Sequence, residues 1–174
     1  MKILLPLVFR LIVCSVNGQS LVRDDFKGFS RSDFTISYPS DWRVDTSGTM
    51  NTKVFFFSPL EGPEDKFSDN LNVMIQNLAG HQIDIQKYKE ISEQQIKAMF
   101  SDGKLLESKV MNSNGREEYR LSYEFSQGTF KLKVLAVCFI KNDMAYLATF
   151  TSEVSKFEGY RETAEKMLGA LSMK

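Results

Sequence analysis

The chain has 174 residues, in which 22 Lys and Arg balance 22 Asp and Glu, with one His and two Cys. Hydrophobic residues make up 43% of it, including 14 Phe, which excludes a disordered or low-complexity polypeptide. A net charge of zero argues against nucleic acid as a partner, because binding to phosphates requires a surplus of Lys and Arg. The length predicts one domain that can bury enough surface to fold without disulfides.

The first 20 residues are typical of a secretory signal peptide. Lys2 precedes an apolar run that is too short to span a bilayer, and Arg10 interrupts this run. Two ways of processing stay open: cleavage before Gln19, or lipidation of Cys14, because residues 11–14 resemble a lipobox. Both predict an exported protein, periplasmic or secreted, whose only contact with a membrane is a lipid anchor at Cys14 if that residue is modified. An apolar first strand is the structural alternative.

Removal of residues 1–20 leaves 20 Lys and Arg against 22 Asp and Glu, and Cys138 as the remaining cysteine. A single cysteine cannot form an intramolecular disulfide, so the hydrophobic core must stabilise the exported chain. Residues 21–33 are polar and predict a loose lead-in. Residues 34–174 predict a single domain, which we expect to be monomeric.

The first half of this domain predicts four strands and a helix. Residues 34–38 alternate between apolar and polar and end at Pro39, which lacks the backbone donor that a strand ladder needs. Between residues 84 and 100 the apolar side chains return every three to four positions, which predicts an amphipathic helix capped by Asp84. The other strands are predicted at residues 42–44, 52–58 and 70–78.

The second half predicts an antiparallel meander and a closing helix. Asn114-Gly115 is a strong hairpin signal, because both central residues of a type I′ turn need positive φ. Residues 134–140 are almost all apolar, which predicts a central strand covered on both faces. Ser155 and Glu158 match a capping box at the start of the last helix. The remaining predicted strands are residues 104–111, 119–125 and 144–151.

The predicted order of elements is β-β-β-β-α-β-β-β-β-α. Two helices that each carry one apolar stripe must cover sheet surface. This pattern predicts the α+β class, with an antiparallel β-sheet flanked by two main α-helices.

Several strings in this order resemble the PsbP family, the extrinsic subunit of the photosystem II oxygen-evolving complex and its relatives. They are found at residues 34–42 (FTISYPSDW), 69–75, 105–108, 114–125 and 145–150, and in the closing helix. The resemblance covers residues 29–173 and implies a PsbP-like fold that has no enzymatic activity and docks on protein complexes or assists their assembly. It also implies relatedness to exported bacterial members, many of which are lipoproteins. The family has no set of catalytic residues to carry over.

Two residues could in principle support catalysis. His81 is the sole histidine and has Asp84 nearby in sequence, but no further metal ligand or orienting group accompanies it. A solvated loop position is therefore expected for it. Cys138 lies among apolar residues, where desolvation disfavours the reactive thiolate, so a core cysteine is expected.

Two further features are candidate binding sites. Glu61, Glu64, Asp65 and Asp69 form an acidic loop that could supply some of the oxygen ligands of a calcium ion, although their spacing matches no EF-hand. A solvated loop is the alternative. Phe56, in the run of three Phe at 55–57, is either a core residue or, if one face of the sheet is open, part of a partner-binding patch.

These observations predict a non-catalytic exported PsbP-like protein that binds a protein partner, as an assembly or accessory factor at an envelope or membrane complex. The alternative is an extracytoplasmic carrier of a small ligand or calcium, which would use a cleft between the helix at 84–100 and the sheet. No cofactor is expected. An enzyme is a third alternative, and no phosphate-binding loop or nucleophile motif supports it.

Overall fold

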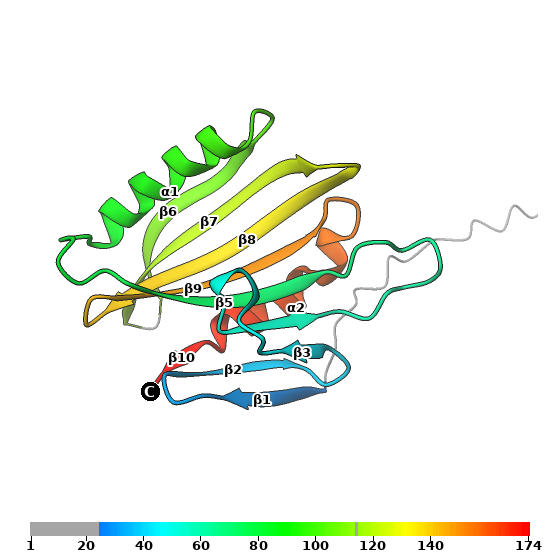
Figure 1. Cartoon of the computed structure of the whole chain (residues 1–174), viewed down its shortest axis with the longest axis horizontal. Helices are drawn as coiled ribbons and strands as arrows, with labels where there is room; N and C mark the ends of the chain where they lie inside the picture. Colours follow the sequence, from blue (N-terminus) through cyan, green and yellow to red (C-terminus); the bar gives the residue numbers. More distant parts are fainter. Residues whose placement is uncertain (1–24, 114) are drawn as a thin grey trace, which may run out of the picture.

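A computed structural model of the chain describes residues 25–113 and 115–174 (Figure 1). The predictions of a signal peptide and of a lipidated Cys14 lie outside the described residues. Within them, no helix is long and apolar enough to cross a membrane.

The described residues form ten strands and two α-helices, and they confirm the predicted α+β class and each of the predicted strands and helices. Two strands, β1 and β10, were not predicted, and β1 lies within the segment expected to be a loose lead-in. The elements are β1 (Phe26–Ser30), β2 (Phe34–Pro39), β3 (Arg43–Asp45), β4 (Val54–Phe57), β5 (Asn70–Asn77), α1 (Ile85–Met99), β6 (Lys104–Ser113), β7 (Arg116–Gln127), β8 (Phe130–Lys141), β9 (Met144–Glu153), α2 (Phe157–Gly169) and β10 (Ser172–Met173), with a short 3-10 turn at Thr49–Asn51.

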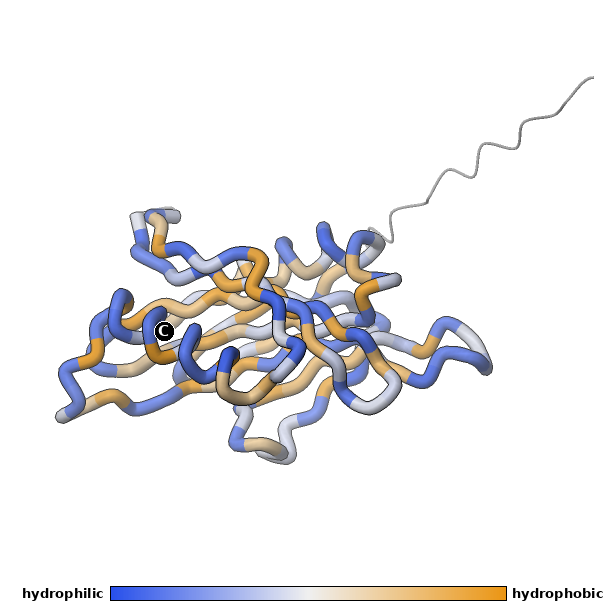
Figure 2. Tube along the Cα trace, turned by 90° about the horizontal axis from the view of Figure 1, so that it is seen from above, coloured by the Kyte–Doolittle hydropathy of each residue, from blue (hydrophilic) through white to orange (hydrophobic). Residues whose placement is uncertain are grey.

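The strands form two antiparallel sheets. The larger has seven strands in the order β3-β4-β5-β9-β8-β7-β6, and the smaller has the order β1-β2-β10. Helix α2 and the smaller sheet lie against one face of the larger sheet, whereas α1 packs over β6 and β7 on the opposite face (Figure 1). Figure 2 shows hydrophobic residues along the strands, and mainly hydrophilic residues in the loops.

Strand β8 separates two hydrophobic clusters. Leu135, Val137 and Phe139 face the cluster beneath α2, and the alternate residues Ala136 and Cys138 face the cluster beneath α1. All of them are buried. The prediction of a strand with apolar side chains buried on both faces is confirmed.

The two helix starts behave differently. The predicted cap of α1 is confirmed, because Asp84 Oδ1 accepts a hydrogen bond from Lys87 N at 2.8 Å. The predicted capping box of α2 is wrong: the cap residue is Lys156, and no side chain caps the helix. This Lys side chain instead points into an ion-pair network with acids, which a local pattern in the sequence cannot reveal.

Phe56 is completely buried between the two sheets, so it is a core residue and contributes to no exposed patch. Its ring meets Phe29 of β1 edge to face at 5.5 Å and Tyr38 of β2 at 4.7 Å. The candidate role of Phe56 in partner binding is therefore corrected: the small sheet covers this face of β4.

Candidate functional site

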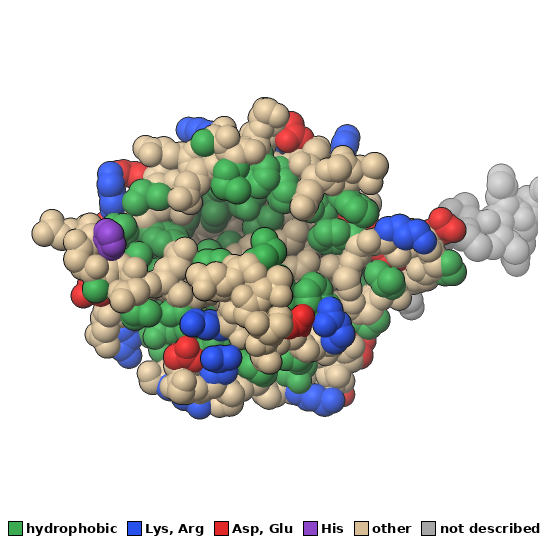
Figure 3. All heavy atoms as spheres, in the orientation of Figure 1, with side chains coloured by type: hydrophobic (Ala, Val, Ile, Leu, Met, Phe, Trp, Pro, Cys, Tyr) green, Lys and Arg blue, Asp and Glu red, His purple; other side chains and the backbone are tan. Residues whose placement is uncertain are grey.

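Helix α1 covers only part of the sheet face on which it packs, and the rest of that face is open. It packs mainly on β6 and β7 and buries Ile85 and Ile96, and it reaches β5 at one end through Tyr88. Figure 3 shows the result: a hollow on this face that is lined by hydrophobic side chains, with the charged residues gathered around its edge. We call this hollow the groove. The sequence predicted a cleft at this place, between the helix at 84–100 and the sheet.

The inner part of the groove is a cavity of about 190 Å³ between α1 and the sheet. Val134, Ala136 and Cys138 of β8 line it together with Leu147 of β9. Because every second residue of a strand faces the same side, these β8 residues form one continuous apolar strip. The walls include aromatic residues, namely Tyr88 of α1, Phe100 directly after α1, and Tyr119 and Tyr123 of β7.

The outer part of the groove is a hollow of about 370 Å³ toward β4 and the preceding turn. It adjoins the inner part, because Leu132 lines the outer part and Val134, two residues further on β8, lines the inner part. On β7, Tyr123 lines the inner part and Phe125 lines the outer part, and their ring centroids are 5.7 Å apart. Phe55, Phe57 and Phe67 complete the aromatic lining.

Two exposed methionines lie at the edges of the groove. Met99, at the end of α1, is 70% exposed and lines the inner part, and Met50 is 77% exposed and lines the outer part. Met50 and the next residue, Asn51, both have left-handed backbone, with φ of 55° and 61°. Non-glycine residues adopt this conformation at a cost in free energy, and such strain gathers at functional sites.

The groove carries almost no charge. None of the residues that line its inner part is ionised at neutral pH, and Asp45 is the charged residue among those that line the outer part. Burial raises the pKa of the Cys138 thiol to about 12, so the thiol stays protonated. The polar residues that line the inner groove are neutral. They include Gln76, whose Oε1 accepts a hydrogen bond from Tyr88 Oη at 2.7 Å.

The structure does not bring His81 and Cys138 into one site. His81 is exposed and lines a separate hollow of about 300 Å³ that adjoins the groove at Tyr88. Cys138 is buried in the inner groove. No carboxylate lines either cavity, so His81 has no orienting acid there and Cys138 has no neighbouring base.

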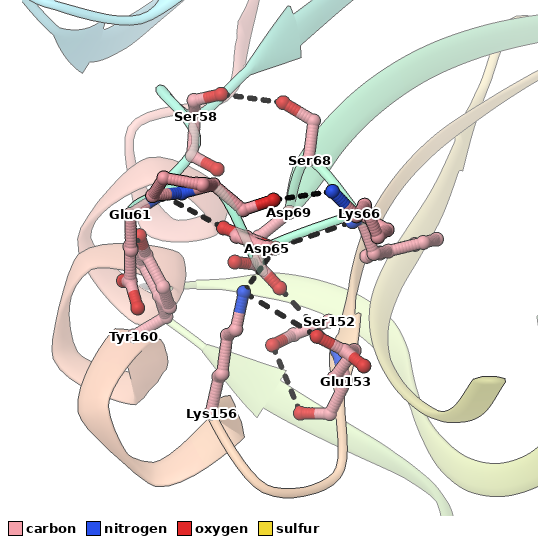
Figure 4. Close-up of polar contacts among 12 residues, drawn as sticks. Ser58, Glu61, Asp65, Lys66, Ser68, Asp69, Ser152, Glu153, Lys156 and Tyr160 are labelled. Carbon is pink, nitrogen blue, oxygen red and sulfur yellow. Dashed lines mark hydrogen bonds and ion pairs between the residues drawn. The ribbon is translucent and has the colours of Figure 1, made fainter.

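The acidic loop surrounds Lys156, which lies between β9 and α2 (Figure 4). Lys156 Nζ is 2.6 Å from Asp65 Oδ1 and 3.3 Å from Glu153 Oε2. Glu61 Oε1 accepts a hydrogen bond from Tyr160 Oη at 2.7 Å.

Asp69 is completely buried beside this lysine. Its Oδ1 accepts a hydrogen bond from Glu153 N at 3.3 Å, and burial raises the pKa of its carboxyl group to about 6. Glu64 is exposed. Among the residues that the structure describes, no three or more His, Cys, Asp or Glu are grouped so as to hold a metal ion. The geometry of Glu61, Asp65 and Asp69 therefore favours an ion-pair network over a calcium site.

Sequence reasoning did not identify the residues of the groove. The alternation of apolar and polar residues at 119–125 predicts one buried face, formed by Tyr119, Leu121 and Tyr123. The structure confirms it, because these residues face α1. The pattern does not reveal how far α1 extends across the strands. The signal that the sequence offers is this alternation, which marks the face and not its open part.

Comparisons with known proteins place the fold. The PsbP family model matches residues 24–173. No curated protein matches the sequence. The solution structure of cyanobacterial PsbP from Synechocystis is similar with a TM-score of 0.65 at 13% identity, over 92% of this chain and 97% of that one.

Two other bacterial structures are similar at 12% identity. LpqN, involved in cell envelope biogenesis of Mycobacterium tuberculosis, has a TM-score of 0.65 over 86% of this chain and 91% of its own. PA94 of Pseudomonas aeruginosa, a protein of unknown function, has a TM-score of 0.61 over 86% of this chain and 98% of its own. With a family match over nearly all of its length and the same arrangement of sheet and helices, the chain belongs to the PsbP family.

Proposed function

We propose that this protein is a non-catalytic, exported accessory protein that binds an apolar part of its partner in the groove beneath α1. The observation that carries the proposal is the half-covered sheet face: a neutral, aromatic-lined hollow next to a closed core. Exposed apolar surface of this kind marks binding sites in soluble proteins. The similarity to LpqN, a protein involved in cell envelope biogenesis, supports a role at the envelope or at a membrane complex.

Binding accounts for the groove better than catalysis does. An acid–base or nucleophilic mechanism needs an ionisable group whose pKa lies near the working pH, within reach of a second such group. Cys138 is the groove residue whose side chain could act as a strong nucleophile, and its raised pKa keeps it in the unreactive thiol form.

A fluorescent apolar probe tests this proposal. N-phenyl-1-naphthylamine is uncharged and brightens when it leaves water, so titration into the exported chain measures occupancy of the groove. Thr149, on the open part of β9, lines the inner groove, and we expect Thr149→Trp to abolish binding by filling the space. Thr35→Trp, a half-buried position on β2, is the matched control and should bind like the unmodified protein. Equal binding by both variants would refute the groove as the binding site.

Docking of a protein partner at the sheet edge is the second candidate function. Strand β6 is an end strand of the larger sheet, and Leu105, Leu106 and Met111 on it are exposed. An end strand presents unpaired backbone groups to which a partner segment can add as a further strand. A photo-crosslinking residue at position 106 should then give one defined protein adduct in the native host, and the same residue at Gly28 on β1 should not. Matching adducts at both positions would argue against docking at β6.

Export is part of the proposal and has its own test. Mass spectrometry of the N-terminus of the exported protein separates the two processing routes. A chain that begins at Gln19 supports simple cleavage, and a chain that begins at a lipid-modified Cys14 supports anchoring. An intact Met1 on a cytoplasmic chain would contradict export.

A further inference from the structure

We propose that the groove holds a single alkyl chain that carries an uncharged head group, as in a neutral single-chain lipid such as a monoacylglycerol. This inference rests on the proposed binding function and specifies the chemistry of the ligand. The observations behind it are the chemistry of the floor, the length of the apolar strip and the charge of the lining.

The floor of the groove suits a chain without polar groups. Val134, Ala136 and Leu147 offer no hydrogen-bond donor or acceptor, and the protonated thiol of Cys138 is a weak one. A polypeptide laid on this floor would bury backbone N–H and C=O groups without partners, which is costly. An alkyl chain carries no such groups, so the same surface binds it without that penalty.

The strip is long enough to hold one lipid chain along its whole length. The residues of β8 that line the groove extend from Leu132 to Cys138, which is about 20 Å along a strand. An acyl chain of a membrane lipid spans half of a hydrocarbon core about 30 Å thick, or about 15 Å. Met50 and Met99, exposed at the edges, have unbranched flexible side chains that can adjust to the chain.

The charge of the lining selects an uncharged head group. A carboxylate or phosphate would need Lys or Arg, and neither lines the inner part, the outer part or the adjoining hollow, in which His81 is exposed to solvent. At the end opposite the outer part, Gln76, Ser92 and Gln95 line both the inner groove and the hollow that adjoins it at Tyr88. Their amides and hydroxyl can pair with hydroxyl or ester groups, so the head group lies at this end.

Displacement of bound N-phenyl-1-naphthylamine from the exported chain tests the inference. The competitors are 1-monoacylglycerols with eight to sixteen carbons, the fatty acids of equal length at about pH 8, and an apolar amphipathic peptide. We expect the monoacylglycerols to compete with a Kd that falls roughly fourfold for each added methylene until the groove is filled. The fatty acids should compete at least tenfold more weakly. Gln76→Leu should weaken monoacylglycerol binding severalfold more than it weakens binding of the probe, because the probe has no hydroxyl or ester group to pair with the amide.

The outcomes separate the two proposals. Probe binding that depends on Thr149, combined with no displacement by any alkyl compound, would overturn the ligand class and leave the groove as a binding site. Equal competition by fatty acids would overturn the uncharged head group, and displacement by the peptide alone would assign the groove to a protein segment. No probe binding at all would overturn both the ligand and the proposed function.

Discussion

The two faces of the larger sheet come from the same strands, yet they differ in how they are covered. On one face α2 and the smaller sheet enclose a core in which Trp42, Phe150 and Tyr160 are completely or almost completely buried. On the other face α1 covers β6 and β7 and leaves the groove beside it. Apolar residues therefore serve two purposes on one sheet: on the closed face they stabilise the fold, and on the open face we propose that they bind.

The largest expected effect on the free energy of unfolding comes from truncating two residues of β9, Phe150 and Leu147, which point to opposite faces of the sheet. Phe150 is completely buried, with its ring centroid 5.9 Å from that of Phe157 and 6.3 Å from that of Tyr160. Phe150→Ala should lower the free energy of unfolding by about 3–5 kcal/mol, because it leaves a cavity in the core. Leu147→Ala, in the groove, should lower it by about 1 kcal/mol or less, because the site is half open.

Urea unfolding of both variants measures this difference. Equal losses of stability would mean that the face beneath α1 is as tightly packed as the face beneath α2. The comparison between a closed and an open face would then fail.

A second test concerns the buried carboxyl group of Asp69 near α2. Burial raises its pKa from 3.8 to about 6, so the folded protein binds this proton more tightly than the unfolded chain does. The resulting stabilisation is fully present below about pH 3.8 and is lost as the pH rises to about 6. At neutral pH the charged group therefore opposes folding, by up to about 3 kcal/mol.

Asp69→Asn should remove this part of the pH dependence, so that the stability difference between about pH 4 and pH 7 becomes smaller. Lys156 keeps Asp65 and Glu153 as partners in this variant. Denaturant unfolding at several pH values measures the slope. Asp45 provides the control variant Asp45→Asn: it is half-buried at the edge of the groove, and its pKa lies below its usual value because Ser47 donates hydrogen bonds to it. An unchanged slope for Asp69→Asn would show that other groups set the pH dependence.

The smallest effect is expected at the wall of the groove. Tyr88→Phe removes the hydroxyl that donates to Gln76 Oε1 at 2.7 Å and leaves the ring in place. A net loss of about 1 kcal/mol in the free energy of unfolding follows from one hydrogen bond. Thermal or urea unfolding measures it. A loss above about 3 kcal/mol would indicate that this wall is part of a closed core.

Much of the fold could be predicted from local patterns. The apolar run at 134–140 predicted a doubly covered strand, and Asp84 predicted the start of α1, because each pattern has one simple physical solution. Strand β1 was missed because its residues are mostly exposed, and it is held by Phe29 against Phe56 of a distant strand. Its existence depends on tertiary packing that no local pattern contains.

The site was harder to predict for the same reason. The sequence pointed to a cleft beside the helix at 84–100, but the reach of α1 over the sheet depends on how the chain crosses from β5 to β6. For the acidic loop, the sequence suggested a calcium site that the structure does not favour. Asp65 and Asp69 look like cation ligands in sequence, and only the folded chain brings Lys156 to them.

The most direct test of the central claim is a methyl NMR titration with N-phenyl-1-naphthylamine. Val134 and Val137 lie on the same strand, β8, one toward the groove and the other toward the closed core. The account predicts that the probe shifts the methyl signals of Val134, Leu132 and Leu147 and leaves those of Val137 and Leu135 in place. Shifts at Val137 as large as those at Val134, or no shift at either residue, would contradict it.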